Sequence, residues 1–500
     1  MTHKKIKIGT GHMLSVKNCI QAFNETELVL SNMAKKKIQK SAQFLEKKIQ
    51  SREVIYGINT QFGDQMSHAD HLLNSQNEEA YFGSLKARQY HLVKSHYAGL
   101  GPEVDPKAVR LTMLLRAHSI AQGYSGVTLP LVEKLLHWFH DDITPVVYQY
   151  GSIGASGDLI PLATIAAALI GEPVKIRVKG IEKLASELTE PAHELCVREG
   201  LALINGTSFM TAIATIAFSH LERLVRQMID IIGMTLEVLY VNSDHYEPLL
   251  QQLKGHPGSI MVCEWLKPFF NMPDQKKPYM LQNYYSLRSV CQGFGPLVDN
   301  LEHARVMIEH EINAVTDNPI VDPKNKRILH GANFMGHYIT SAADLLKMDI
   351  AQASTWVHAI LAVLYHPRKN ADLPTNLLED PATFNGFRPL QLLAASIAVE
   401  NRKLAQSHQA FMLPTEGDNQ DVNSLGTHAA LDLQKVTENL ERLVAILYLS
   451  AAQAWEYRDQ NTMSAVSRKL YKKLRKVVPA RKEDGLFTPE LEKVIALLQE

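Results

Sequence analysis

Hydrophobic residues recur with the 3.6-residue period of an amphipathic helix over most of the chain from about residue 155 onward. The average helix has only about 11 residues, and several of these patterns are far longer and partly apolar on every side. The longest cover residues 211–241, 295–315, 333–364, 389–411 and 426–457. Helices of this kind predict a central bundle whose outer faces meet other subunits. The fold class is therefore predicted to be mainly α.

Strand signals are few and short, at Lys5–Ile8, Val174–Val178 and Ile328–Leu329. Gly, Pro and Asn gather instead in a small number of loops between the periodic segments. No internal repeat and no low-complexity linker is visible. These patterns divide the chain into an N-terminal mixed domain over residues 1–205, a central long-helix bundle over 206–457 and a C-terminal helical region over 458–500.

Composition and charge exclude several classes of protein. The chain has 500 residues, of which 46% are hydrophobic and 21% charged, so collagen-like, disordered and disulfide-scaffold structures are excluded. Lys plus Arg and Asp plus Glu both total 52, so no net charge attracts the protein to nucleic acid. The basic stretch 468–476 is interpreted as one solvated face of a helix.

Cysteine usage and hydropathy both favour a cytoplasmic protein. The cysteines at positions 19, 196, 263 and 291 form no close pair, which is typical of a reducing compartment. The run 159–171 has 13 residues, short of the roughly 20 that a bilayer requires. The N-terminus has charge but no adjoining apolar core and no cleavage site. We expect no membrane association.

The loop YGSIGASGDL, residues 150–159, is the most informative segment of the sequence. Its glycines allow an anion-binding loop at a helix N-terminus, but the Lys of a phosphate-binding loop is missing. It is not a Gly-x-Ser-x-Gly nucleophile motif either. A helix-capping turn with Asp158 near the N-cap remains open. In a further alternative, the Gly157 amide nitrogen attacks the Ala155 carbonyl, and loss of water, including the Ser156 hydroxyl, leaves an electrophilic alkene.

Six blocks besides this loop, in order along residues 50–460, carry a resemblance to a known family. They are YGINTQFG (56–63), EGLALINGT (199–207), YSLR (285–288), DNP (317–319), HGANF (330–334) and NQDVNSLG (419–426). Together with Gly154-Ala-Ser-Gly-Asp-Leu159, the chain resembles the aromatic amino acid ammonia-lyase and aminomutase family. The resemblance implies a carbon–nitrogen lyase whose prosthetic group, 4-methylideneimidazole-5-one (MIO), forms autocatalytically from Ala155, Ser156 and Gly157. It implies no PLP and no metal.

The same resemblance implies roles for individual residues. Tyr56 would remove the β-proton, Asn205 would hydrogen-bond the MIO carbonyl oxygen, and Tyr285 would lie near the substrate amine. Arg288 would bind the substrate carboxylate with its planar guanidinium. Supporting polar contacts and ring packing would come from Gln282, Asn318 and Phe334. The family architecture also implies a homotetramer in which three chains build each site.

The ring-binding residues give a mixed indication of the substrate. Ser95 and His96 resemble the pair in histidine ammonia-lyases and in some tyrosine lyases, and a polar pair favours a ring with a hydrogen-bonding group. Gln420 instead resembles the phenylalanine and tyrosine branch, because histidine lyases carry Glu there. Arg388 stands where histidine lyases have Met and phenylalanine lyases have Lys. Tyrosine is the first expectation, giving the trans-acrylate.

Several alternatives remain open from the sequence. Histidine (giving urocanate) or phenylalanine is the alternative substrate, and a 2,3-aminomutase would share every catalytic part. An inactive scaffold with this fold would be expected to lose Tyr56, Ser156, Asn205 or Arg288, and all four are present. A nucleic-acid-binding module that uses the basic C-terminal stretch is disfavoured by the neutral net charge.

Overall fold

The chain folds into two compact units, each built from three separate segments. The computed structural model describes residues 4–24, 26–66, 73, 76–270 and 278–500. Unit 1 comprises Met1–Ile216, Arg305–Ala343 and Ser407–Leu431, and unit 2 comprises Ala217–Ala304, Asp344–Gln406 and Asp432–Glu500. The division into domains at residues 205 and 457 stays a prediction.

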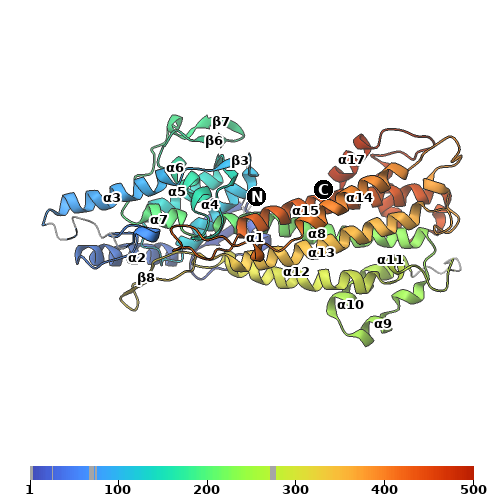
Figure 1. Cartoon of the computed structure of the whole chain (residues 1–500), viewed down its shortest axis with the longest axis horizontal. Coiled ribbons are helices and arrows are strands. Elements are labelled where there is room, and N and C mark those ends of the chain that lie inside the picture. Colours follow the sequence, from blue (N-terminus) through green and yellow to red (C-terminus); the bar gives the residue numbers. More distant parts are fainter. Residues whose placement is uncertain (1–3, 25, 67–72, 74–75, 271–277) are drawn as a thin grey trace. The chain divides into compact units, whose positions relative to one another are not determined.

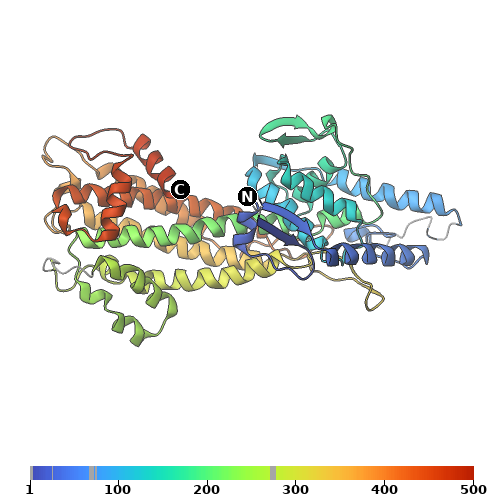
Figure 2. The same ribbon diagram turned by 180° about the vertical axis from the view of Figure 1, so that it is seen from behind.

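The strands of unit 1 are short and form small separate sheets. The strands are β1 (Lys4–Ile8), β2 (Thr26–Leu30), β3 (Leu100–Glu103), β4 (Ile143–Pro145), β5 (Tyr148–Tyr150), β6 (Lys175–Val178), β7 (Ile181–Leu184), β8 (Ile320–Asp322) and β9 (Arg327–Leu329). β1 and β2 pair in parallel, with Ile6 opposite Leu28. Figure 2 shows the two strands as dark blue arrows beside the N-terminus. β4, β6 and β7 form an antiparallel sheet, and β3–β5 and β8–β9 are antiparallel pairs.

Unit 1 also contains several shorter helices (Figure 1). They are α1 (Val16–Gln21), α2 (Asn32–Gln50), α3 (Glu78–Ser95), α4 (Pro106–Ile120), α5 (Leu129–His140), α6 (Leu159–Leu169) and α7 (Glu199–Ile204). Standard signals begin several of them: the Ser31 side chain caps α2, and Asp105 with Pro106 starts α4. Buried Leu45 of α2 and Leu85 of α3 pack in one core cluster with residues 55 and 58. This cluster anchors the loop that carries Tyr56.

Four long helices contribute residues to both units. They are α8 (Ser208–Val238), α12 (Val290–Ile312), α13 (His337–Tyr365) and α15 (Gly426–Ala454). Within unit 2 they run side by side in both ribbon views (Figures 1 and 2). Their apolar side chains are largely buried, which explains the near-continuous hydrophobicity of the sequence. The predicted long helices are confirmed, with ends displaced by up to a turn or two.

The remaining helices of unit 2 are shorter. They are α9 (Pro248–Lys254), α10 (Pro257–Leu266), α11 (Tyr285–Arg288), α14 (Arg388–Leu404), α16 (Ala465–Arg475) and α17 (Thr488–Gln499). The predicted helix over 389–411 is α14, which ends at Leu404. The mainly helical fold class is confirmed.

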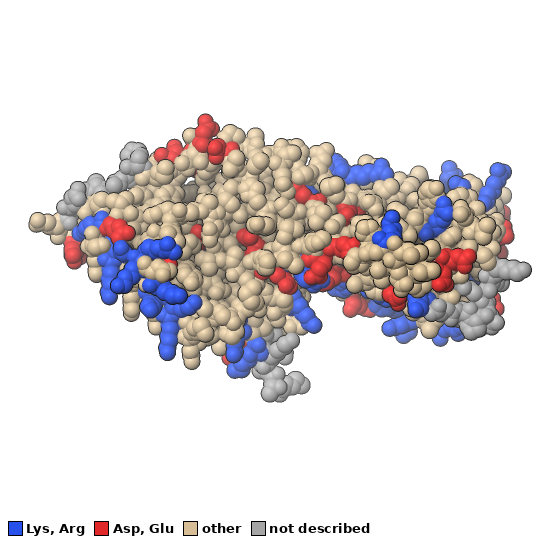
Figure 3. Space-filling view, turned by 90° about the horizontal axis from the view of Figure 1, so that it is seen from below, with Lys and Arg blue, Asp and Glu red and all other residues tan. Residues whose placement is uncertain are grey.

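The stretch Glu199–Val238, which contains α7 and α8, is long and apolar enough by composition to cross a membrane. However, 94% of its most apolar window is buried inside the protein, as expected for a core helix. Charged groups of both signs are interspersed on the surface. Figure 3 shows a denser group of Lys and Arg at the end of unit 1 where α2 lies, and α2 alone contains six lysines.

Candidate active site

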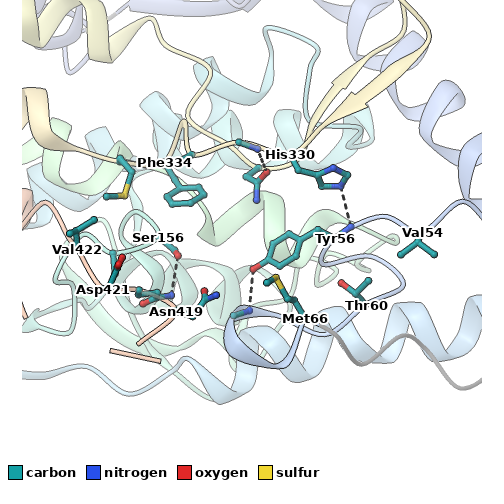
Figure 4. Close-up of a pocket in the computed structure, with 17 residues that line it drawn as sticks. Val54, Tyr56, Thr60, Met66, Ser156, His330, Phe334, Asn419, Asp421 and Val422 are labelled. Carbon is teal, nitrogen blue, oxygen red and sulfur yellow. Dashed lines mark hydrogen bonds between the residues drawn. The ribbon is translucent and has the colours of Figure 1, made fainter. Parts of the chain in front are cut away.

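A cavity of about 620 Å³ in unit 1 brings together residues from four separate loops. Six of the predicted site residues line it, namely Tyr56, Ala155, Ser156, Asn318, Phe334 and Gln420. In Figure 4 the phenol oxygen of Tyr56 and the hydroxyl of Ser156 both face the interior of the cavity, and the Phe334 ring lies above Ser156. The phenol of Tyr56, the loop that carries Ser156 and the ring of Phe334 therefore line the same cavity.

The loop that carries Tyr56 is fixed by the buried side chain of Asn59. Its amide oxygen accepts from the Ile55 N–H at 2.7 Å, and its nitrogen donates to the Glu53 carbonyl at 2.8 Å. Gly57 adopts a φ of +67°, and a Cβ there would lie 2.5 Å from Leu201. The chain can therefore turn sharply immediately after Tyr56, as only glycine readily allows.

The side chain of Tyr56 is half-buried, and its oxygen has a defined partner. The Gly63 N–H donates to the phenol oxygen at 3.1 Å, and the same N–H can stabilise negative charge on that oxygen. The Tyr56 N–H donates to His330 Nε2 at 3.3 Å, which links this loop to the HGANF segment (Figure 4). The geometry suits a phenol that exchanges a proton with a molecule in the cavity.

Ser156 lies between two side-chain amides. Gln420 Nε2 donates to its hydroxyl oxygen at 3.1 Å, and Asn205 Nδ2 donates to its carbonyl oxygen at 3.0 Å. Thr415 in turn donates to the Gln420 amide oxygen at 3.0 Å, which fixes the direction of that amide. The amide oxygen of Asn205 is buried and has no hydrogen-bond partner among the described residues. The side-chain N–H of Asn205 therefore donates to the Ser156 carbonyl, while its side-chain oxygen stays unpaired among the described residues.

The glycines of the Ala-Ser-Gly loop are required by close approach. Gly154 and Gly157 adopt φ values of +65° and +73°. A Cβ on Gly157 would lie 2.3 Å from the Gly206 carbonyl oxygen, so only glycine fits between the two backbones. With the serine hydroxyl held, the following glycine unhindered by a side chain, and an amide donor on the carbonyl, these residues fit the MIO group that the sequence implies.

Asp158 occupies the N-cap position of α6, but its carboxylate does not cap that helix. It accepts from the Met210 N–H in the first turn of α8 at 2.9 Å and from the hydroxyls of Ser152 and Thr427 at 2.7 and 2.6 Å. Burial raises the pKa of Asp158, and these hydrogen bonds oppose the rise. Asp158 therefore lies at the predicted N-cap position, but its carboxylate binds the first turn of α8, which presents free N–H groups.

The opposite wall of the cavity is formed by the loop after α12. Asn318 accepts from the Gly331 N–H at 2.9 Å through its side-chain oxygen. Gly331, Ala332 and Met335 line the cavity beside Phe334. The bond between Asn318 and Gly331 connects the DNP and HGANF motifs, which places two motifs distant from Tyr56 in sequence at the same site.

The predicted ring-binding pair lies outside the residues that line the cavity. Ser95 and His96 are at the end of α3 in unit 1, where Ser95 Oγ donates to the Leu92 carbonyl at 3.1 Å and His96 Nδ1 lies 2.9 Å from the same oxygen. The two side chains also contact each other at 3.2 Å. Within this chain, their polar atoms are directed to the helix end.

Four further predicted residues belong to unit 2 and do not line the cavity of unit 1. Tyr285 and Arg288 form α11, where the Tyr285 side chain is 73% exposed and the Arg288 guanidinium lies 4.6 Å from its ring centre. Gln282 and Arg388 are exposed as well. The guanidinium of half-buried Arg288 therefore lies over the ring of an exposed tyrosine.

Sequence reasoning missed several residues that line the cavity. They are Val54, Thr60, Met66, His330, Met335, Asn419, Asp421 and Val422. His330, Asn419, Asp421 and Val422 belong to quoted motifs, so their positions carried a signal. Val54 and Met66 flank the tyrosine loop and have no distinguishing pattern. Among the described residues, no group of three His, Cys, Asp or Glu side chains is arranged to hold a metal ion.

Comparison with known proteins gives one consistent family. The family described as "Aromatic amino acid lyase" matches residues 14–476. A histidine ammonia-lyase from Geobacillus sp. (strain WCH70) is 32% identical over 491 residues, covering 97% of this chain and 94% of the relative. The structure is similar to the Pantoea agglomerans phenylalanine aminomutase (TM-score 0.91, 25% identity, 99% of both chains). It is also similar to the Streptomyces globisporus tyrosine aminomutase (TM-score 0.91, 26% identity, 100% of this chain and 97% of that one).

Proposed function

This chain belongs to the aromatic amino acid lyase family and is a carbon–nitrogen lyase, and we propose that it removes ammonia from L-histidine to give the trans-acrylate, urocanate. The observation that carries the choice of histidine is the 32% identity to a histidine ammonia-lyase over nearly the whole of both chains. The exposed carboxylate of Asp421 and the amide of Asn419 at the cavity are acceptors that suit an imidazole N–H. Histidine therefore replaces tyrosine as the first expected substrate.

The chain's own residues supply the acid–base and binding parts of the reaction. MIO, formed from Ala155, Ser156 and Gly157, would supply an electrophile that activates the substrate amine as a leaving group. Tyr56 faces the cavity and takes the β-proton through its phenol oxygen, which the Gly63 N–H holds in place. Asn205 donates to the oxygen of Ser156, where negative charge develops. No PLP is required.

Binding of the substrate carboxylate calls for a cation, and none of the described cavity-lining residues is Arg or Lys. Arg288 supplies that group in our proposal, with Tyr285 beside it. Because Tyr285 is exposed and Arg288 is half-buried on α11 of unit 2, we propose that a second subunit contributes them and that the enzyme is a homotetramer with shared sites. Gln282 and Arg388, also exposed, would complete the ring and amine contacts from neighbouring chains.

Tyrosine is the second candidate, and Gln420 favours it. The Gln420 amide donates to Ser156 and accepts from Thr415, so both ends of a neutral amide are used at this position. A glutamate, as in the histidine branch, would place an acceptor against the Ser156 hydroxyl oxygen instead. The neutral residue supports the phenylalanine and tyrosine branch. Phenylalanine itself is disfavoured if Ser95 and His96 meet the ring, because its phenyl group leaves them unpaired.

The product distinguishes a lyase from an aminomutase. Two of the similar solved structures are aminomutases, and a mutase would return ammonia to the β-carbon before the acrylate leaves. We propose the lyase outcome. The four cysteines are free in the structure, which supports a reducing compartment, and we propose a cytoplasmic location.

The deciding experiment incubates purified protein separately with L-histidine, L-tyrosine and L-phenylalanine. Ultraviolet absorbance follows each conjugated acrylate, and chromatography detects β-amino acids. Histidine is expected to give the highest kcat/KM and urocanate as the product. A higher kcat/KM for tyrosine would establish the second candidate, and β-amino acid as the main product would establish a mutase.

Gln420→Glu tests the branch assignment directly. If Gln420 limits imidazole binding, the ratio of kcat/KM for histidine over tyrosine should rise by about 10-fold or more, which corresponds to one interaction of roughly 1.4 kcal/mol. Thr415→Val is the matched control, because it removes only the bond that orients the amide. An unchanged ratio in Gln420→Glu would show that this residue does not select the substrate.

A further inference from the structure

Three charged side chains, Arg116, Arg198 and Asp317, are buried together in unit 1, and of these only Asp317 belongs to a motif of the sequence analysis. Arg198 Nη2 donates to Asp317 Oδ1 at 2.6 Å, and Arg116 Nη2 lies 3.6 Å from Asp317 Oδ2. All three side chains are at most 2% exposed. Two guanidiniums thus share one carboxylate. Burying a charge without full compensation is costly, so this cluster requires an explanation beyond stability.

Arg116 is tied to the helix that presents Asn205. Its Nε donates to the Ala202 carbonyl in α7 at 2.8 Å, and its Nη1 donates to the Thr316 carbonyl at 2.8 Å. Helix α7 ends at Ile204, and Asn205 follows as its C-cap. The Arg116 guanidinium therefore connects α7 to the segment that precedes Asp317, and so fixes the position of Asn205.

The backbone of Gly206 lies between the Arg116 guanidinium and the Ala-Ser-Gly loop. A Cβ on Gly206 would lie 2.1 Å from Arg116 Nη1. On the other side of that backbone, a Cβ on Gly157 would lie 2.3 Å from the Gly206 carbonyl oxygen. The two glycines are what permit this stacking. Only Gly206 separates Arg116 from the loop.

Burial shifts the pKa values of the charged groups in this region. Burial lowers the pKa of Arg116 to about 10, repulsion from Arg198 acts in the same direction, and Asp317 opposes both. Burial also raises the pKa of Asp158, next to Gly157, and of Glu311, which accepts from Thr207. Two guanidiniums face the one carboxylate of Asp317, so the arginine charge is only partly compensated by its neighbours.

We propose that Arg116 is a positioning residue for the elimination: it holds Asn205 against the Ser156 carbonyl and keeps a partly compensated positive charge behind that carbonyl. The inference rests on the proposed function, in which negative charge develops on this oxygen. A charge behind the donor strengthens the donor's effect in a water-poor site. Arg116 itself touches neither substrate nor reacting atoms.

The test separates charge from hydrogen bonding with two variants. Arg116→Met removes the charge and leaves the Arg198–Asp317 pair, whereas Arg116→Lys keeps the charge and loses the fork. Arg110→Met on the same helix is the matched control, because Arg110 donates to the Phe139 carbonyl and pairs with Asp142, away from the cavity residues. Intact mass first establishes that the MIO forms in each variant.

Two readouts follow for each protein. The first is kcat and KM with the best substrate. The second is the rate constant for inactivation by cyanide, a small anionic nucleophile to which MIO would present an electrophile. No leaving group or substrate is needed, so this readout reports stabilisation of negative charge whichever amino acid is the substrate.

Arg116→Met should lower kcat by about 10- to 100-fold with little change in KM, and should slow cyanide inactivation. Arg116→Lys should restore most of both, and Arg110→Met should match the wild type. Equal losses in Arg116→Met and Arg116→Lys, or an unchanged rate of cyanide inactivation in Arg116→Met, would overturn the proposal. If Arg116→Met does not fold, Arg198→Met removes one positive charge from the same cluster and leaves the Arg116 hydrogen bonds intact, so Asp317 then compensates the Arg116 charge fully. An unchanged cyanide rate in Arg198→Met would overturn the proposal. A wild-type chain without MIO would instead refute the proposed function.

Discussion

Hydrogen bonds from two side chains hold Ser156 and the Ala-Ser-Gly loop in place. Asn205 and Gln420 approach the serine from different segments, one bonding its carbonyl and the other its hydroxyl. An amide nitrogen is a donor at any working pH, so this arrangement does not depend on protonation. It holds the serine carbonyl where a developing charge can be stabilised.

Tyr56→Phe isolates the role of the phenol. The variant keeps the ring and loses only the oxygen that Gly63 holds, so MIO formation should be intact and kcat should fall by about 10² to 10⁴. Mass spectrometry of the variant and its turnover of the best substrate check both expectations. Val54→Ala, at the same cavity but without a titrating group, is the control. Turnover at the wild-type rate would remove Tyr56 as the base.

The sequence could identify the residues of known motifs but not those that act through burial. Tyr56, Ser156 and Gln420 were predicted from their motifs and line the cavity together. Arg116 was not predicted, because a single arginine in an apolar helix carries no signal until tertiary structure buries it beside Asp317. Their assigned roles stay predictions until the variants are measured.

At the scale of elements, the long helices were predictable, and so were β1, β6 and β9, whereas the other described strands were not. A helix such as α8 repeats its pattern over many turns, so periodicity identifies it, although α8 begins at Ser208 rather than at residue 211. Strands β4 and β5 have three residues each, too few for alternation to be seen. Their pairing depends on partners distant in sequence, as with β3 and β5.

The pair α12–α13 allows a pH test of helix packing in unit 2. Asp349 on α13 accepts from Asn300 on α12 at 2.8 Å. Burial raises the pKa of Asp349 to about 6, and the Asn300 bond opposes the rise. Since the unfolded pKa is about 3.9, the folded carboxyl holds its proton more tightly, so ionisation destabilises the fold as pH rises from about 4 to 6.

Asp349→Asn should therefore raise the thermal unfolding midpoint by a few degrees at pH 8, because the isosteric amide cannot ionise and still accepts from Asn300. At pH 4 the two proteins should unfold at nearly the same temperature. Calorimetry across this range measures the difference. A gap that is equal at both pH values, or largest at pH 4, would show that ionisation of Asp349 does not limit stability.

For the whole molecule, the central question is how the cavity of unit 1 obtains a cation. The proposed carboxylate-binding residue, Arg288, is half-buried on α11 of unit 2, and we propose that another chain supplies it. Co-expression of Tyr56→Phe with Arg288→Met tests this. Each variant alone should be nearly inactive, but mixed oligomers should contain some sites with both intact residues and recover activity.

Recovery above the sum of the separate variants, in a peak of tetramer size on gel filtration with light scattering, is the expected result. Co-expression of two Tyr56→Phe chains with different affinity tags is the control and should recover nothing. Activity no higher than the sum would indicate that each site uses residues from a single chain, and a monomeric peak would exclude shared sites.

The prosthetic group is the claim on which the chemical account depends, and the intact mass of the purified chain tests it most directly. Cyclisation and dehydration of Ala155-Ser156-Gly157 remove two water molecules, so the mature protein should be lighter than its sequence by that mass. Ser156→Ala, which has no hydroxyl to lose, should not form the group and should be inactive. A wild-type mass equal to that of the unmodified sequence in an active preparation would contradict the account.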